Sequence, residues 1–192
     1  AKWDTDSFFG SVVDKEFRLS EDHSSTKPVI INSVNLSDRD GYIFEFKAQK
    51  YGGPSYRIMP VIRYRDQTTF AQFWLYDNAP TWCRDFRSPV VPPGWQWPMG
   101  TINVGANNIC DEKWHDWKIV VKGADNTLYI DGKLIGSCQS FPELVGRNDL
   151  KVGLSTYDTF AAFDNVRIRK HPEIEVTSTV SSAEDKSVPD GS

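Results

Sequence analysis

The stretch that decides the fold runs from Trp114 to Arg169, where several β-strand patterns follow one another. It begins with WHDWKIVVKG (114–123), continues with TLYIDGKLIG (127–136), and ends with VGLS (152–155) and FDNVRIR (163–169). Apolar residues recur at every second position in these runs, which is the period of a strand with one buried face. Asp131-Gly132 stands between two apolar runs and favours the positive φ angles of a type I′ hairpin turn. The segment therefore predicts an antiparallel meander.

Short runs with the same alternation extend outward from this stretch over residues 8–170, separated by turn signals such as Asp40-Gly41 and Asp77-Asn78. None of them sustains a helical period, although the polar residues around Glu143 leave room for one turn of helix. Many short strands at this spacing are typical of a sandwich or jelly roll. We therefore predict an all-β fold, a two-sheet antiparallel β-sandwich (jelly roll), in one domain over residues 1–170.

Two segments interrupt the strand pattern. Residues 77–112 form a connection far longer than a hairpin needs, and it holds three tryptophans and five prolines. We interpret it as an ordered, functional insertion. Residues 171–192 are rich in Ser, Thr, Glu and Asp, which is typical of a linker to a further domain or of a solvated tail.

The composition narrows the classes of partner. The net charge is −4, so no overall positive field favours nucleic acid or an anionic membrane. No apolar run approaches the ~20 residues of a membrane-spanning helix, so we expect no membrane insertion. The aromatic content is high, at 13% with seven tryptophans, and requires an explanation.

The three cysteines, Cys83, Cys110 and Cys138, have no C-x-x-C spacing, which argues against a zinc site. In the expected meander, Cys110 and Cys138 fall at opposite ends of a strand of about eight residues. At ~3.3 Å per residue this separation far exceeds the ~6 Å that a disulfide spans. The favoured pair is therefore Cys83 with Cys110, which would close the insertion and leave Cys138 free. The alternative is three reduced cysteines.

Strand parity also predicts a ligand surface. In the runs 42–49, 56–65 and 70–76, one parity is apolar and should face the core, while the other should face solvent. If the three strands are neighbours, their solvent parity combines flat aromatic rings with amides and charged groups, as a sugar-binding surface requires, and its arginines also suit a carboxylated or sulfated glycan. The alternative is that Trp74 and Tyr76 lie beneath the insertion as a second small core. The expected contacts are Glu45, Lys47, Arg57, Arg63, Gln72, Trp74 and Tyr76, completed from the insertion by Trp82, Trp95 and Trp97.

The sequence offers little support for catalysis. Glycoside hydrolysis uses two carboxylates across the scissile bond, and Glu45 stands alone on its strand. No Ser/His/Asp or Cys/His arrangement can be argued from the spacing, and we expect a structural role for His115. We therefore predict a protein that is not an enzyme.

The motifs quoted above, with their Trp114-x-x-Trp117, Asp131-Gly132 and Phe163-Asp164-Asn165-Val166 patterns, resemble the concanavalin A-like (laminin G-like) jelly-roll superfamily. More narrowly, they resemble glucanase-like sandwich modules of large secreted or cell-surface proteins of bacteria and archaea. The resemblance implies two curved sheets, an extracellular or cell-surface location and a carbohydrate-binding or adhesive role. It also implies a structural Ca²⁺ in many cases, with Asp164 and Asp6 (or Asp4) as the expected donors.

Together these observations predict a non-catalytic carbohydrate-binding module that recognises a polysaccharide by aromatic stacking and by Arg and Gln hydrogen bonds. One alternative is a structural or adhesive cell-surface or filament subunit that self-associates. A second alternative is a polysaccharide-cleaving enzyme that uses Glu45 as one of its carboxylates.

Overall fold

The computed structural model describes residues 10–13, 15–21, 28–31, 33–55, 57–75, 81–87, 94–96, 101–102 and 111–172. These residues form fourteen strands and one short 3₁₀ helix, η2. The strands are β1 (Gly10–Val13), β2 (Glu16–Glu21), β3 (Val29–Ile30), β4 (Tyr42–Gly52), β5 (Ile58–Asp66), β6 (Thr69–Trp74), β7 (Thr81–Arg87), β8 (Gly94–Gln96), β9 (Thr101–Ile102), β10 (His115–Lys122), β11 (Asp125–Ile130), β12 (Lys133–Gln139), β13 (Lys151–Thr156) and β14 (Thr159–Lys170).

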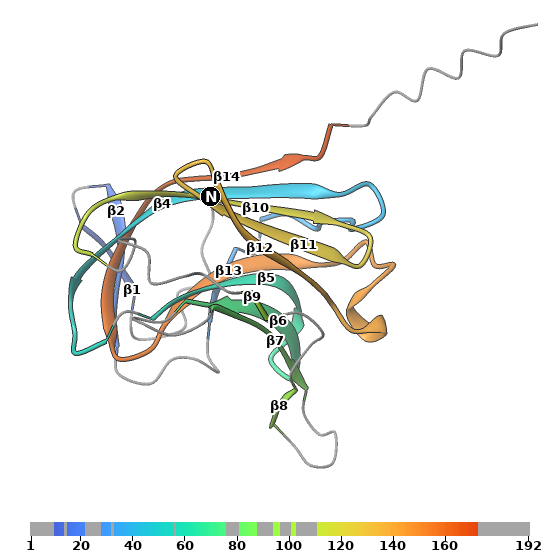
Figure 1. The fold of residues 1–192 in the computed structure, drawn as a ribbon, viewed down its shortest axis with the longest axis horizontal. Helices are drawn as coiled ribbons and strands as arrows, with labels where there is room; N and C mark the ends of the chain where they lie inside the picture. The colour runs from blue at the N-terminus through green and yellow to red at the C-terminus, as the bar shows by residue number, and fades with distance from the viewer. Residues whose placement is uncertain are drawn as a thin grey trace, which may run out of the picture.

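Two antiparallel sheets form the two layers of a sandwich (Figure 1). The first sheet has the order β1-β2-β14-β4-β10-β11-β12. The second has the order β3-β13-β5-β6-β7-β8, with β9 also paired to β7. The predicted all-β sandwich is therefore confirmed, and η2 (Pro142–Leu144) is the single helical turn expected around Glu143.

The meander that the sequence predicted is the centre of the first sheet. Strand β10 pairs with β11 and β11 with β12, and Asp131 and Gly132 have φ angles of 50° and 74° at the turn. Both values are positive, as a type I′ turn requires. The turn before β11 lies at Gly123, with φ 54°, and Asn126 belongs to the strand that follows.

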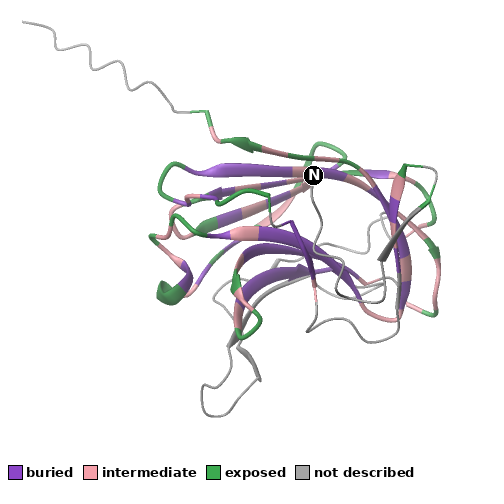
Figure 2. Cartoon of the chain, turned by 180° about the vertical axis from the view of Figure 1, so that it is seen from behind, coloured by how far each residue is buried: buried purple, intermediate pink, exposed green. Residues whose placement is uncertain are grey.

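The core lies between the two sheets, and Figure 2 shows the buried residues running along the strands of both layers. As parity predicted, Phe44 and Phe46 of β4 and Trp117 of β10 point inward. Phe46 and Trp117 are directly opposite in the register, and their rings stack at 5.5 Å between centroids. Aromatic pairs in this arrangement add about 0.5–1.5 kcal/mol beyond the burial of their surface.

The segment 77–112 differs from the predicted long connection, because strands β7, β8 and β9 lie within it. Strand β7 pairs with every residue of β6 and extends the second sheet. The described strands end at Lys170, and residues 173–192 of the expected tail lie outside the described residues. In the described parts of the chain, no helix is long and apolar enough to span a membrane.

Candidate functional site

The predicted ligand surface is divided between the two sheets. Strand β4, with Glu45 and Lys47, belongs to the first sheet, whereas β5 and β6, with Arg63, Gln72 and Trp74, belong to the second. The expectation that the three strands are neighbours on one face is therefore wrong. Hydrophobic alternation assigns a strand to a buried face, but it does not say which strands pair, and both sheets supply such strands to the same core.

Arg63 lies inside the protein, not on a ligand surface. The register shifts between Val61 and Arg63, because three residues of β5 match two of β6. This β-bulge reverses the parity of the strand, so that Ile62 and Arg63 both turn toward the interior. Arg63 is fully buried, and its guanidinium lies 2.6 Å from the carboxylate of Asp38.

The outer parity of β6 was predicted correctly, but the side chains there are buried. Gln72 is 0% and Trp74 7% exposed, and the Gln72 amide nitrogen lies 3.9 Å from the sulfur of Met59. Ile30, Val61 and Phe70 form a second small hydrophobic cluster against which Tyr64 packs. Trp74 belongs to neither hydrophobic cluster of the described residues, so the alternative, in which Trp74 and Tyr76 lie beneath the insertion as a second small core, stays a prediction.

The other predicted contacts are partly described. The Arg57 side chain is half-buried, lies 3.4 Å from the Asp158 carboxylate, and stacks over the Tyr157 ring. Trp82 and Trp95 lie on β7 and β8, whose side chains are outside the described set, as are Tyr76 and Trp97 altogether. The contacts expected of these four aromatic residues stay predictions.

An open groove of about 500 Å³ lies on the outer face of the first sheet. Its walls come from β4, β10, β11 and β14, which are neighbours in the sheet, and from the β11–β12 turn. Ligand sites commonly have volumes of about 300–1,000 Å³. The groove is lined by Glu45, Phe46, Lys47, Asp116, Trp117, Lys118, Tyr129, Gly132, Asn165 and Arg167.

One row of side chains crosses this groove perpendicular to the strands. In the register, Arg167 is opposite Glu45, Glu45 is opposite Lys118, and Lys118 is opposite Tyr129. Directly opposed residues point to the same face, so the four side chains stand side by side over four strands. With strands ~4.8 Å apart, the row is about 14 Å long. We call Arg167, Glu45, Lys118 and Tyr129 the groove row.

A bulge in β14 brings Arg167 into the row. The register shifts between Asp164 and Arg167, and Asn165 takes a φ of 51° at this point. The extra residue allows Asp164 and Arg167 to face outward together, while Val166 and Ile168 pack against the core. The strand alternation of 163–169 alone does not contain this information.

The charges along the groove are partly neutralised. Arg169 donates hydrogen bonds of 3.1 and 3.0 Å to the two Glu45 oxygens, and Lys47 lies 3.5 Å from the Asp116 carboxylate. The hydrogen bond from Arg169 outweighs desolvation and lowers the pKa of Glu45, and Lys118 and Arg167 act in the same direction. The Lys118 ammonium lies over the Tyr129 ring, 5.4 Å from its centroid.

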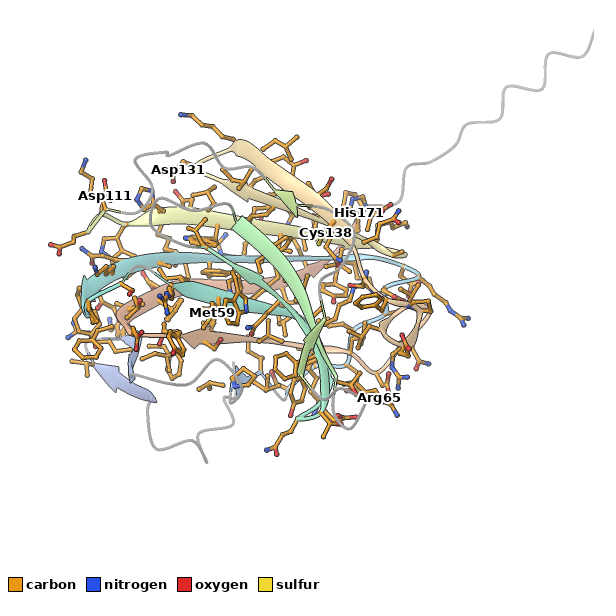
Figure 3. The ribbon with its side chains drawn as sticks, turned by 60° about the horizontal axis from the view of Figure 1, so that its bottom comes forward. Met59, Arg65, Asp111, Asp131, Cys138 and His171 are labelled. Carbon is orange, nitrogen blue, oxygen red and sulfur yellow. The ribbon has the colours of Figure 1, made fainter. Side chains whose placement is uncertain are left out.

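A histidine holds one end of the groove. His115 Nδ1 lies 2.7 Å from the Asp131 carboxylate, and Nε2 lies 2.9 Å from that of Asp111. Asp131 also accepts a hydrogen bond from the backbone N–H of Asp116, which lines the groove. Asp111 and Asp131 are seen together at one end of the first sheet in Figure 3. The structural role expected for His115 is thus to join the residue 111 segment to the Asp131 turn.

His115, Asp111 and Asp131 shift one another's pKa values. Burial alone would lower the pKa of His115, but the hydrogen bonds and charges of Asp131 and Asp111 outweigh it and raise the pKa. Burial would raise the pKa of both carboxyls, and their bonds to His115 and to backbone N–H groups lower it instead. The charged imidazolium is therefore favoured in this position.

The predicted calcium site is only partly within the described residues. Asp164 Oδ1 accepts a hydrogen bond from the backbone N–H of Asn165, and Asp6 and Asp4 lie outside the described residues. Within the described ranges, no three His, Cys, Asp or Glu side chains gather closely enough to hold a metal ion. The Ca²⁺ site stays a prediction.

The cysteine pairing departs from expectation. Cys138 is buried on β12 and its sulfur is disulfide-bonded, so it is not the free cysteine that we expected. The chain has only three cysteines, so a bridge between Cys83 and Cys110 would leave Cys138 without a partner. The Cys83 side chain and the whole of Cys110 lie outside the described set, so the partner of Cys138 is not among the described side chains.

Sequence comparison finds no matching family model and no matching curated protein. Solved structures do match. A carbohydrate-binding module, CBM66 from Bacillus subtilis, aligns with a TM-score of 0.62 at 13% identity, over 84% of this chain and 91% of that chain. Sheep galectin-11 in complex with glycerol has a TM-score of 0.53 at 10% identity, over 74% and 97%. The β-glucanase of Bacillus licheniformis has a TM-score of 0.56 at 12% identity, over 84% and 82%.

These similarities establish the fold, which is the concanavalin A-like jelly roll that the sequence motifs predicted. The similar structures include a carbohydrate-binding module and galectins as well as a GH43 protein and a β-glucanase. The fold is therefore shared by proteins that bind carbohydrate and by proteins that cleave it. Function has to be argued from the site.

Proposed function

We propose, on the premise that this chain carries a concanavalin A-like jelly roll, that it is a non-catalytic carbohydrate-binding module with its ligand in the groove of the first sheet. The observation that carries the proposal is the groove row, which places an aromatic ring beside charged donors in an open groove of about 500 Å³. A pyranose ring offers apolar C–H faces to an aromatic side chain and hydroxyls to planar or charged donors. The carbohydrate-binding proteins among the similar structures support the same class of ligand.

The groove suits an extended polymer better than a single sugar. Its polar groups are spread over four strands instead of converging on one point. Of the contacts predicted from sequence, Glu45 and Lys47 lie in it, and Tyr129, Lys118 and Arg167 replace those of the second sheet. We propose an extracellular or cell-surface location, which would give such a module access to polysaccharide.

Affinity electrophoresis against a panel of polysaccharides tests this function. The native chain should be retarded on at least one polymer, and Tyr129→Ala should weaken binding about tenfold, which corresponds to ~1.4 kcal/mol of lost stacking. Tyr51→Ala is the matched control, because Tyr51 is a partly exposed tyrosine at the end of β4, outside the groove. Equal binding by both variants would show that the ligand does not contact Tyr129.

Strand β12, an edge strand of the first sheet among the described residues, supports a second candidate function, self-association. Strand β12 ends the sheet order, and Leu134 on it is 63% exposed. An edge strand with an exposed apolar side chain can pair with a strand of another copy. Sedimentation without glycan tests this candidate, which predicts concentration-dependent assembly that Leu134→Lys abolishes. A monomer at all concentrations would exclude it.

Catalysis by Glu45 has less support from the geometry. A glycosidase general acid needs a raised pKa, whereas the ion pair with Arg169 lowers the pKa of Glu45. Glycoside hydrolases are nevertheless among the similar structures, so the activity needs a direct test. Release of reducing ends from the same panel, abolished by Glu45→Gln, would establish an enzyme.

A further inference from the structure

The groove row carries more positive charge than its own ion pairs neutralise. The Glu45 carboxylate is already bound by Arg169, and the Lys47 and Asp116 charges neutralise each other. Among the residues described, neither Lys118 nor Arg167 forms an ion pair. Lys118 and Arg167 are therefore two groove cations without a direct ion pair, in a protein whose net charge is −4.

The sheet holds the backbones of these two cations at a fixed separation across the groove. In the register, Arg167 and Lys118 stand on either side of Glu45, on strands that are two spacings apart. Two spacings of ~4.8 Å place their backbones about 10 Å from each other, across the groove. Arg167 is exposed, so its guanidinium is available to bind a carboxylate or sulfate with two parallel hydrogen bonds. Lys118 is a compact point charge beside the Tyr129 ring.

The chain positions this pair with defined structural devices. Lys118 faces outward because its neighbours Trp117 and Ile119 are both buried in the core. Arg167 faces outward because the β14 bulge shifts the register by one residue. Both cations lie on strands and not on loops, so the sheet fixes the spacing between their backbones.

We propose that the groove is selective for an anionic polysaccharide, one that carries carboxylate or sulfate groups on its sugar units, and that Arg167 and Lys118 bind two of these groups along the polymer. The proposal rests on the carbohydrate-binding function proposed above and specifies its ligand class. Tyr129 supplies the apolar contact with a sugar ring, and the two cations supply the preference for charge.

Polygalacturonate and its fully methyl-esterified form make a matched pair of probes, because they share a backbone and differ in charge. The native chain should bind the acidic form and bind the ester at least about tenfold more weakly. Raising the ionic strength from ~0.05 M to ~0.5 M shortens the screening length and should weaken binding to the acid several-fold. A heparin arm tests a sulfated polymer, and binding to heparin alone would identify sulfate as the recognised group.

Charge-removing variants locate the effect. Lys118→Gln and Arg167→Gln should each weaken binding to the acidic polymer about fivefold, the factor for ~1 kcal/mol. Lys122→Gln is the matched control, since it removes one positive charge from the same strand outside the groove. Unchanged thermal melting of each variant would exclude misfolding as the cause.

Two outcomes would overturn the inference in different ways. If acid and ester bind equally, and binding depends on Tyr129 but not on Lys118 or Arg167, charge selectivity is wrong and the carbohydrate-binding function stands. If no polymer on the panel is retained, both the selectivity and the proposed function are wrong.

Discussion

Removing one partner of the buried ion pair between Arg63 and Asp38 should be strongly destabilising, and Arg63→Met tests this. Arg63 donates from Nη1 to Asp38 at 2.6 Å and to the Leu144 carbonyl at 2.9 Å, from Nε to Asn126 at 2.8 Å, and from Nη2 to the Gly123 carbonyl. Both charged side chains are 0% exposed. These bonds join β5 to β11, to η2 and to two turns.

The expected loss follows from what the substitution leaves behind. Methionine fills much of the same space, but it leaves a buried carboxylate without its counter-ion, and three further acceptors without this donor. Breaking a buried pair in this way costs about 3–5 kcal/mol. At ~2–4 °C per kcal/mol for a domain of this size, the melting temperature should fall by about 6–20 °C.

Arg65→Met on the same strand is the matched control. Arg65 is exposed and lies 3.4 Å from the Asp66 carboxylate, so its loss should cost no more than ~0.5 kcal/mol. Thermal unfolding followed by tryptophan fluorescence measures both variants. Adding Asp38→Asn to Arg63→Met should recover part of the lost stability, because it removes the unpaired charge. If Arg63→Met melts as Arg65→Met does, the buried network does not contribute as argued.

Three further results are expected. Because the pKa of His115 is raised, its contribution to folding stability is complete below the ordinary histidine pKa of ~6.5 and is lost as pH rises through the folded value. The melting temperature should therefore fall more between about pH 6 and pH 9 in the native protein than in His115→Gln. Parallel curves of melting temperature against pH would contradict this. Gly153→Ala should destabilise the β3–β13 pair by at least ~1 kcal/mol, since a Cβ would stand 2.4 Å from the Val29 carbonyl oxygen; an unchanged urea midpoint would refute the contact. Tyr42→Phe should cost about 1 kcal/mol through the lost hydrogen bond from its hydroxyl to the Ile62 carbonyl, and a neutral effect in the same assay would mean that this bond contributes nothing.

The two carboxylates bound to His115 give the opposite dependence of stability on pH. The pKa values of Asp111 and Asp131 are lowered, so their contribution is present above the ordinary carboxyl pKa of ~3.9 and is lost as pH falls through the folded values. Together with the histidine, this gives the interaction its full strength between about pH 4 and pH 6.5. The end of the groove near Gly132 should be held most firmly in this range.

The sequence by itself determined the fold class and the inward face of most strands. The alternation in 42–49 and 114–123 placed Phe44, Phe46 and Trp117 in the core, and Asp131-Gly132 specified its hairpin turn. These features are local, because alternation and turn chemistry depend on residues close in the chain. The motifs that resemble a jelly roll are local in the same sense, and the jelly-roll fold was confirmed.

Only the tertiary structure decided which strands share a sheet and where the bulges lie. Strand pairing put Glu45 in one sheet and Gln72 and Trp74 in the other. One extra residue in β5 directs Arg63, a predicted ligand contact, into the interior, where it forms a buried ion pair. A second bulge brought Arg167 beside Glu45 in the groove. Each extra residue reverses the parity that follows it, and a sequence read with a fixed period of two cannot show where this happens.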